Sequence, residues 1–279
     1  MTISIDAAAV RLAWQIALVI VFAFVAGYII HWLRRAFRRW PTPTTPQAPV
    51  EVKGERIAYY DIVQRLFHWF NFVVMGVIVL SGVTIFFGSQ ANVLMTLFGT
   101  TSRSDLILLH TTFIWGLLGL IVIHLIWDDF VAKGFRNIWV SGRDIRDAIK
   151  RAENFLGLSL QYPRDAKYDI FMKTYHWGLT VSLVVLGISG VYFMNPYGLI
   201  PSLTYGMEYV LRLLHDIFAF LLVGLVIGHI YFAVLPANWP ILKAMITGTA
   251  LTDFYVKRFD AARWKPRQLV EVERSKEKA

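Results

Sequence analysis

The chain has 279 residues, of which 56% are hydrophobic and 17% are charged, and its formal net charge is +9. A soluble domain carries about 25% charged residues, so this composition excludes an ordinary soluble protein and favours an integral membrane protein. The chain has no cysteine, which excludes iron–sulfur clusters, thiolate-bound haem, thioether-linked haem and disulfides within it.

The first predicted elements are an apolar helix and a linker. The stretch from about Val10 to Trp32 is long enough to cross a bilayer, which takes about 20 residues, and it lacks a signal-peptide cleavage site. We therefore expect a retained transmembrane anchor in residues 1–40. Four prolines in residues 41–49 predict an extended linker over residues 41–56.

Four further apolar segments predict the transmembrane core. They run approximately from Ile62 to Phe87, from Leu106 to Trp127, from Ile170 to Met194 and from Met207 to Leu235. Together with the first helix, they give five transmembrane helices. We expect the core to occupy residues 57–260 and a charged cytoplasmic tail to occupy residues 261–279.

Positive charge is concentrated on alternate connections. Six Lys and Arg residues lie in residues 33–56, eight in residues 128–169 and nine after Leu235, whereas the other two connections carry one in all. The positive-inside rule then predicts a protein of the cytoplasmic (inner) membrane with its N-terminus outside and its C-terminus inside. Because topology explains the cations, no nucleic-acid partner is expected. Charged residues at near-helical spacing also predict an amphipathic cytoplasmic helix that lies on lipid or docks a partner: Arg143, Asp144, Arg146, Asp147 and Lys150.

The core is internally duplicated. His68 and His176 each stand between an aromatic residue and a tryptophan, and each is followed thirteen positions later by a Ser-Gly-Val triplet, which begins at Ser81 or Ser189. After each triplet comes an apolar helix with two histidines. Duplication of a two-helix unit predicts an all-α membrane protein: a four-helix transmembrane haem-binding bundle with one extra N-terminal transmembrane helix.

Histidines at matching depths point to haem. His110 and His124 are fourteen positions apart, as are His215 and His229, and this spacing is just under four helical turns, or about 21 Å along the axis. Two helices with imidazoles at two depths suit a stack of two haems, each with one imidazole on either side of its iron. The predicted topology gives an outer level formed by His110 and His215. It also gives an inner level with four members: His68, His124, His176 and His229.

Two other chemistries are less consistent with this pattern. A zinc site gathers four ligands at one point, whereas these histidines are split between two levels. A histidine proton relay does not explain the mirrored spacing. A haem-free channel or transporter lined by histidines is retained as an alternative function.

At these residues the chain resembles the di-haem cytochrome b subunits that anchor respiratory formate dehydrogenases, nickel–iron hydrogenases and thiosulfate reductases in the membrane. The resemblance covers about residues 56–260, and it rests on the segment from Arg65 to Trp69, on Leu109-His110, and on His215 and His229. It implies two non-covalent haem b groups. Their implied iron ligands are His110 and His215 at the outer level, and His68 and His229 at the inner level.

His124 and His176 depart from this family pattern. His124 makes the second and fourth core helices equivalent, as in the cytochrome b of quinol–cytochrome c oxidoreductases. The inner haem would then lie between His124 and His229, which would leave His68 and His176 for quinone or haem propionates. A third haem between His124 and His176, or hydrogen bonds within the inner level, are further alternatives. We prefer the family assignment.

The resemblance implies an electron-transfer subunit of a respiratory chain, which links an Fe–S subunit and a catalytic oxidoreductase subunit to the membrane quinone pool. Arg65, Arg103 and Arg212 lie near the predicted membrane edges, where they are candidates for binding haem propionates or lipid phosphates.

The alternative to an anchor subunit is a stand-alone b-type cytochrome that moves electrons from quinol to a small acceptor. A quinone is expected beside the inner level, which is bordered by polar and aromatic residues: Tyr60, Asp61, Gln64, Lys173 and Tyr175.

Overall fold

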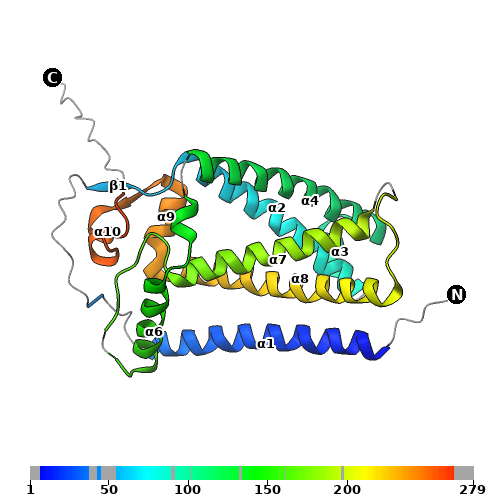
Figure 1. Cartoon of the computed structure of the whole chain (residues 1–279), viewed down its shortest axis with the longest axis horizontal. Coiled ribbons are helices and arrows are strands. Elements are labelled where there is room, and N and C mark those ends of the chain that lie inside the picture. The colour runs from blue at the N-terminus through cyan, green and yellow to red at the C-terminus, as the bar shows by residue number, and fades with distance from the viewer. Residues whose placement is uncertain are drawn as a thin grey trace, which may run out of the picture. The chain divides into compact units, whose positions relative to one another are not determined.

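A computed structural model of the chain describes residues 7–37, 43–44, 55–88, 92–100, 102–131, 134–159, 161–195 and 198–266. Within these ranges the fold is mainly helical, as predicted (Figure 1). Most of the linker expected over residues 41–56, and the expected tail from residue 267 onwards, lie outside the described residues.

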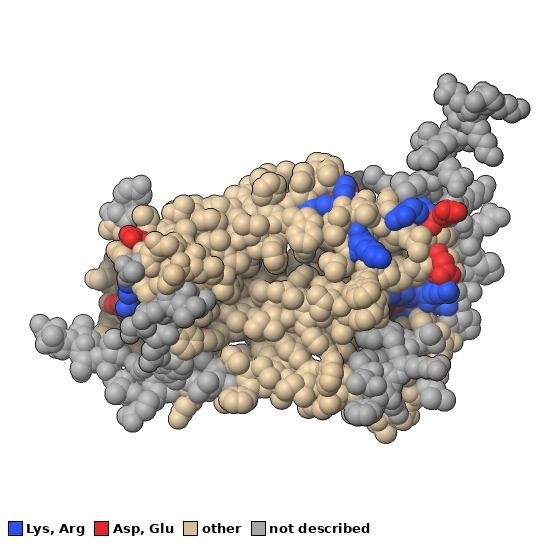
Figure 2. All heavy atoms as spheres, turned by 180° about the vertical axis from the view of Figure 1, so that it is seen from behind, with Lys and Arg blue, Asp and Glu red and all other residues tan. Residues whose placement is uncertain are grey.

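The four apolar core segments form the four long helices that the sequence predicts. Each is long and apolar enough to cross a membrane, and few of its side chains are fully buried within the protein. On the face drawn in Figure 2, a wide band of the surface shows no charged side chains. These helices are α2 (Ile62–Phe87), α4 (Arg103–Ile126), α7 (Ile170–Met194) and α8 (Tyr205–Val234).

The contacts divide the chain into two compact units. The first unit comprises residues 1–39, 70–123 and 174–231, and the second unit comprises residues 40–69, 124–173 and 232–279. Most of the length of each long helix belongs to the first unit. The short helix α3 (Asn92–Leu97) belongs to it as well.

The centre of the first unit is an apolar cluster around Met75, Ile78, Leu117 and Leu222, which are at most 8% exposed. Leu117 is seven residues from both His110 and His124, and Leu222 is seven residues from both His215 and His229. Seven residues make about two turns. The two leucines therefore share a helix face with the histidines, midway between the two levels.

The first helix, α1 (Ala7–Phe37), packs on α8 in the first unit (Figure 1). The Tyr28 hydroxyl donates a hydrogen bond to Gly224 O at 3.0 Å. A Cβ atom on Gly224 would overlap the Phe24 ring, and one on Gly228 would overlap Tyr28. Gly224 and Gly228 form a G-x-x-x-G pair that allows close helix approach, about half a turn around α8 from His215.

The second unit contains the short elements. Strand β1 (Arg56–Ala58) pairs antiparallel with β2 (Thr249–Leu251). The helices are η2 (Trp127–Val131, a π-helical turn), α5 (Phe135–Ile138), α6 (Gly142–Leu156), η3 (Pro236–Asn238), α9 (Trp239–Thr247) and α10 (Thr252–Arg258). Its core includes Tyr255, Phe259 and Ala261, and Trp264 packs against it. Ala261 and Trp264, which were expected in the tail, thus contribute to this core.

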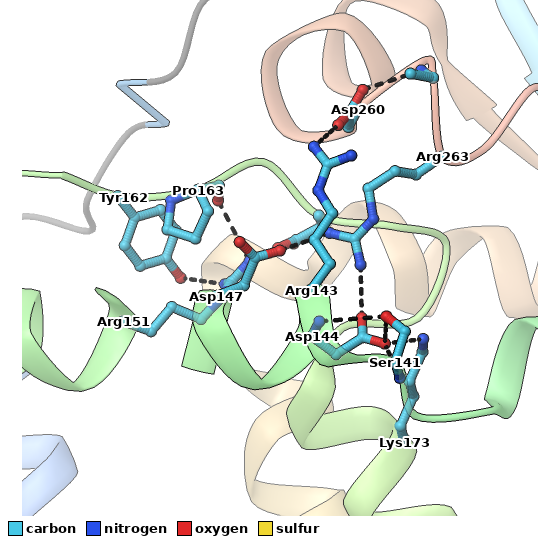
Figure 3. Close-up of polar contacts among 12 residues, drawn as sticks. Ser141, Arg143, Asp144, Asp147, Arg151, Tyr162, Pro163, Lys173, Asp260 and Arg263 are labelled. Carbon is cyan, nitrogen blue, oxygen red and sulfur yellow. Dashed lines mark hydrogen bonds and ion pairs between the residues drawn. The ribbon is translucent and has the colours of Figure 1, made fainter. Parts of the chain in front are cut away.

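Buried ion pairs connect α6 to the rest of the second unit (Figure 3). Asp144 is 1% exposed and accepts hydrogen bonds from Lys173 Nζ at 2.8 Å and from an Arg263 guanidinium nitrogen at 2.5 Å. Arg263 also contacts Asp147 at 2.6 Å. Some charges of the predicted amphipathic helix are therefore engaged within the protein, while its apolar residues Ile145 and Ile149 are each 54% exposed.

Candidate functional site

Each histidine of the outer level is held by a serine from the preceding long helix. Ser81 on α2 has its Oγ 3.0 Å from His110 Nδ1 on α4. Ser189 on α7 has its Oγ 2.8 Å from His215 Nδ1 on α8. All four residues belong to the first unit. The duplication seen in the sequence thus corresponds to one contact made twice.

The serine hydroxyls also determine which nitrogen of each ring carries the proton. The Ser81 hydroxyl donates to Val77 O at 2.6 Å, and the Ser189 hydroxyl donates to Val185 O at 2.7 Å. Since a hydroxyl has one proton, each oxygen is left to accept from the ring, and Nδ1 is the protonated nitrogen. The lone pair is then on Nε2, the form in which a neutral imidazole binds a metal while its other nitrogen is oriented by a hydrogen bond.

The glycine after each serine leaves room for the imidazole. A Cβ atom on Gly82 would lie 3.1 Å from His110 Cε1, and one on Gly190 would lie 3.8 Å from His215 Cε1. The serine therefore orients the ring in both halves, whereas the glycine avoids crowding the ring only in the first half, because 3.8 Å is an ordinary contact distance. The sequence analysis found this repeat but not its role. The signal was present in the constant interval between each triplet and the preceding histidine.

The outer pair fits a haem iron with two imidazole ligands. His110 and His215 are each partly buried, and they lie on α4 and α8 within the first unit. Among the residues that the structure describes, no group of three or more His, Asp or Glu side chains gathers that could hold a lone metal ion. Two oriented imidazoles from opposite halves of a bundle suit a bis-histidine haem better than a zinc ion.

Arg212 lies next to this pair through an aromatic contact. The Phe193 ring meets the His215 ring edge-on at 5.7 Å, and the Arg212 guanidinium lies 4.9 Å from the centre of the Phe193 ring. Glu208 forms an ion pair with Arg212, at 3.8 Å. The side chain of Arg212 is 58% exposed, so it can reach an anionic group near the end of the helix.

At the inner level, an aromatic ring covers one histidine in each half. The Phe67 ring stacks on His124 at 4.4 Å and 15° in the second unit. The Tyr175 ring stacks on His229 at 5.1 Å and 20° in the first unit. Each covering residue immediately precedes the motif histidine of its half. His68 and His176 each contact the tryptophan that follows them. The iron ligands of the inner level stay a prediction.

A carboxylate accompanies His124. Its Nδ1 is 3.3 Å from Asp128 Oδ2. Gln64 Nε2 donates to the other oxygen of Asp128 at 3.4 Å. Trp127 Nε1 donates to Asp61 Oδ2 at 3.3 Å, so the beginning of α2 and the end of α4 form one polar cluster within the second unit.

The ammonium group of Lys167 faces the same cluster. It lies over the rings of Tyr60 at 5.4 Å and Trp264 at 5.9 Å. Burial lowers the pKa of Lys167, and the nearby carboxylates of Asp128 and Asp61 oppose that shift. Asp61 and Gln64 were predicted at this level, whereas Asp128 and Lys167 were not, because nothing local marks a loop lysine as part of a site.

Two other residues proposed from the sequence are engaged elsewhere. Lys173 donates to Asp144 and to Trp139 O at 2.9 Å and is 5% exposed, so it belongs to the ion-pair network. Arg65 donates to Ile246 O at 2.6 Å. Its expected contact with a haem propionate stays a prediction.

A family comparison covers all four long helices. Residues 59–248, more than half of the chain, match the sequence model of a family described as prokaryotic cytochrome b561. No curated protein matches the chain in a sequence search. The family match includes all six histidines of the two levels, and it begins after α1.

Proposed function

Because the chain belongs to the prokaryotic cytochrome b561 family, we propose that it carries electrons through two haem b groups between a partner oxidoreductase and the membrane quinone pool. It is an integral membrane protein and a b-type cytochrome, consistent with a cytochrome b subunit of the nickel–iron hydrogenase type. The resemblance drawn from the sequence is thereby confirmed at the level of the family.

The serine-held pair of the outer level is the observation that carries this proposal. His110 and His215 present Nε2 to the outer haem, while Ser81 and Ser189 keep both rings in the required tautomer. A haem bound in this way supplies a one-electron redox centre with no open coordination position. The protein therefore serves electron transfer and not oxygen or substrate binding at iron.

The second haem is assigned to the inner level, with His68 and His229 as its ligands, as in the related subunits. Leu117 and Leu222 lie midway between the levels, about 10 Å along the helix axis from either one, and both are at most 6% exposed. They belong to an apolar cluster that would separate the two haem positions. Arg212 is assigned to a propionate of the outer haem, because it lies beside His215 through Phe193.

The distribution of charge supports the proposed topology. We assign the N-terminus to the outside and the C-terminus to the inside of the cytoplasmic membrane. The connection 128–169 is then cytoplasmic, and α6 lies on the lipid surface through its exposed residues Ile145, Ile149 and Leu156.

A partner must supply the chemistry that this chain lacks. Without cysteine the chain holds no iron–sulfur cluster, so an Fe–S subunit and a catalytic subunit are proposed to exchange electrons with the outer haem. A stand-alone cytochrome that serves a small acceptor is the alternative. Affinity purification from mild detergent tests this choice, since an Fe–S protein retained in stoichiometric amount supports the anchor function and its absence supports the stand-alone cytochrome.

The haem content of the purified full chain tests the central proposal. We expect two haem b per chain by the pyridine haemochrome assay, and one in His110→Ala and in His215→Ala. His31→Ala is the matched control, because His31 also lies in an apolar helix and hydrogen-bonds a neighbour, Tyr231, at 2.9 Å. This variant should keep both haems. A colourless protein, or full haem in both outer-level variants, would reject the proposal.

A further inference from the structure

The pairing of His124 with Asp128 depends on an unusual turn at the end of α4. The α-helix ends at Ile126 and continues as the π-helical turn η2. Asp128 lies in this turn, with its carboxylate 3.3 Å from His124 Nδ1. Phe67 covers the ring in a parallel stack, so both the plane and one nitrogen of the imidazole are fixed. Single π-helical turns are rare and occur frequently at functional sites.

Groups from three segments converge on this pair within the second unit. From the start of α2, Gln64 donates to Asp128 at 3.4 Å. Asp61, at the same helix end, accepts from Trp127 at 3.3 Å. From the segment before α7, the Lys167 ammonium interacts with both carboxylates. The cluster thus combines proton donors, acceptors and aromatic walls.

The duplication shows that the carboxylate is an addition to one half. His229 corresponds to His124, and both carry a stacked aromatic ring. Four positions after His229 the chain has Ala233, where the first half has Asp128. The outer histidines are oriented by neutral hydroxyls. A carboxylate is therefore not needed to hold a histidine in this bundle, and its presence beside His124 indicates a role beyond the orientation of the ring.

We propose that His124 is the proton-transfer residue of the quinone site and that Asp128 positions it, an inference that rests on the proposed exchange of electrons with quinone. Reduction of a quinone to a quinol takes two electrons and two protons. The electrons arrive through the cytochrome. The imidazolium of His124 donates its Nε2 proton to one carbonyl oxygen, and water supplies the proton for the other oxygen. In quinol oxidation the same proton returns to His124, and the second one leaves to water.

The neighbouring groups support this transfer without taking part in it. Gln64 fixes the second oxygen of Asp128, which keeps the carboxylate directed at His124 Nδ1. The Lys167 ammonium offsets the negative charge of Asp128 and Asp61 and favours negative charge that develops on a quinone oxygen. His124 is thereby separated in role from the iron ligands of either level.

Two substitutions test the proposal in the purified full chain: His124→Gln and Asp128→Asn. The haems are reduced chemically, and their reoxidation is followed by stopped-flow absorbance with either a short-chain quinone or ferricyanide, which accepts electrons without protons. We expect both variants to keep two haems and to react normally with ferricyanide. Reoxidation by quinone should slow by about 100-fold, a typical contribution of general acid catalysis. Asp128→Glu should restore most of the rate.

Asp253→Asn is the matched control. It also removes a carboxylate from an i, i+4 ion pair, with Lys257 at 2.7 Å, at an exposed position of the second unit. It should leave both reactions unchanged. Loss of one haem in His124→Gln would make His124 an iron ligand and overturn the inference. Normal quinone kinetics in Asp128→Asn would also overturn it, while the proposed function would stand. Failure of the unmodified protein to react with any quinone would instead reject the quinone part of the proposed function.

Discussion

The two units of the chain are stabilised by different kinds of contact. In the first unit the buried polar groups are neutral, and hydroxyls such as Ser81, Ser182 and Ser189 satisfy helix carbonyls or histidines. In the second unit the buried polar groups are charged, and Asp144, with its partner Lys173, is an example. Charges are costly at the depth of the lipid chains, so the unit built from the long apolar helices uses hydroxyls and glycines instead.

The same contrast separates the outer haem site from the proposed proton-transfer site. Electron transfer needs neutral imidazoles in a dry environment, and the first unit supplies them at the outer level. Proton transfer needs groups that change charge, and the second unit supplies His124, Asp128 and Lys167. Each of the following predictions tests one side of this contrast.

The largest expected effect separates His68 from His124. We expect His68→Ala to remove one of two haems, because it deletes an axial ligand, and His124→Ala to keep both. Haem per chain, measured by pyridine haemochrome and normalised to protein, gives the result. If His124→Ala lost a haem and His68→Ala did not, the inner haem would use the symmetric pair His124 and His229, and the proposed proton transfer by His124 would be ruled out.

Asp144→Asn should strongly destabilise the second unit. The substitution leaves Lys173 and Arg263 buried with an unpaired charge, and breaking a buried ion pair costs about 3–5 kcal/mol. Hydrogen exchange of the α6 amides, followed by mass spectrometry, should accelerate accordingly. Asp253→Asn removes an exposed ion pair. It should change the free energy of opening, measured by this exchange, by less than about 1 kcal/mol. Equal effects of the two substitutions would show that the buried ion pairs do not stabilise the second unit more than an exposed pair does.

Acid should lower the stability of the second unit before that of the first. Burial alone would raise the pKa of Asp144, but hydrogen bonds from Lys173 and Ser141 lower it to about 2. A carboxylate with a lowered pKa stabilises the fold above its unfolded pKa of about 3.9, and this contribution is lost as the pH falls towards 2. We therefore expect α6 exchange to increase between about pH 4 and pH 2, with a smaller increase in Asp144→Asn. A parallel response in both proteins would argue against this carboxylate as the cause.

Much of the fold was predictable because it depends on local properties. α2 and α7 begin and end at the residues predicted from apolar length, and α4 and α8 differ from the prediction by a few residues. The pairing of β1 with β2 and the ion pair between Asp144 and Arg263 were not predicted. Their members are separated by more than a hundred residues, and neither has a local periodicity that would indicate it.

The candidate site was predictable in its residue types but not in its contacts. Equal spacing of histidines predicted two levels, because helical geometry fixes depth from sequence. The hydrogen bond from Ser81 to His110 depends on how α2 and α4 are rotated about their axes, which the sequence did not reveal. The contacts of Lys167 were not predicted either, because they depend on the path of a loop, which has no sequence periodicity.

Removal of the serine hydroxyls should weaken haem binding without abolishing it. Ser81→Ala and Ser189→Ala each leave a ring Nδ1–H without its acceptor, and loss of such an orienting partner lowers metal affinity by about 10-fold or more. Haem retention during competition with apomyoglobin measures the effect. Ser182→Ala is the control, because Ser182 is also buried and bonds to a carbonyl of its own helix, Gly178 O, but contacts no outer histidine. Equal losses in all three variants would assign the effect to the serine–carbonyl bonds and not to the histidines.

The smallest expected effect concerns α1. In Gly228→Ala the new methyl group would overlap Tyr28, so the tyrosine must shift and its hydrogen bond to Gly224 O is weakened, at a cost of about 1 kcal/mol. The chain has no cysteine, so His31→Cys and Tyr231→Cys together introduce a single cysteine pair between α1 and α8. The rate at which this pair forms a disulfide under oxidation reports on the docking of α1. We expect that rate to fall about fivefold in Gly228→Ala and to stay constant in Gly116→Ala, where a Cβ atom meets nothing within 4 Å.

Haem content should not change in Gly228→Ala, because Gly224 and Gly228 lie on the side of α8 away from His215. If cross-linking is equal in both variants, α1 is held by the linker and the lipid, and close glycine packing does not stabilise this part of the first unit.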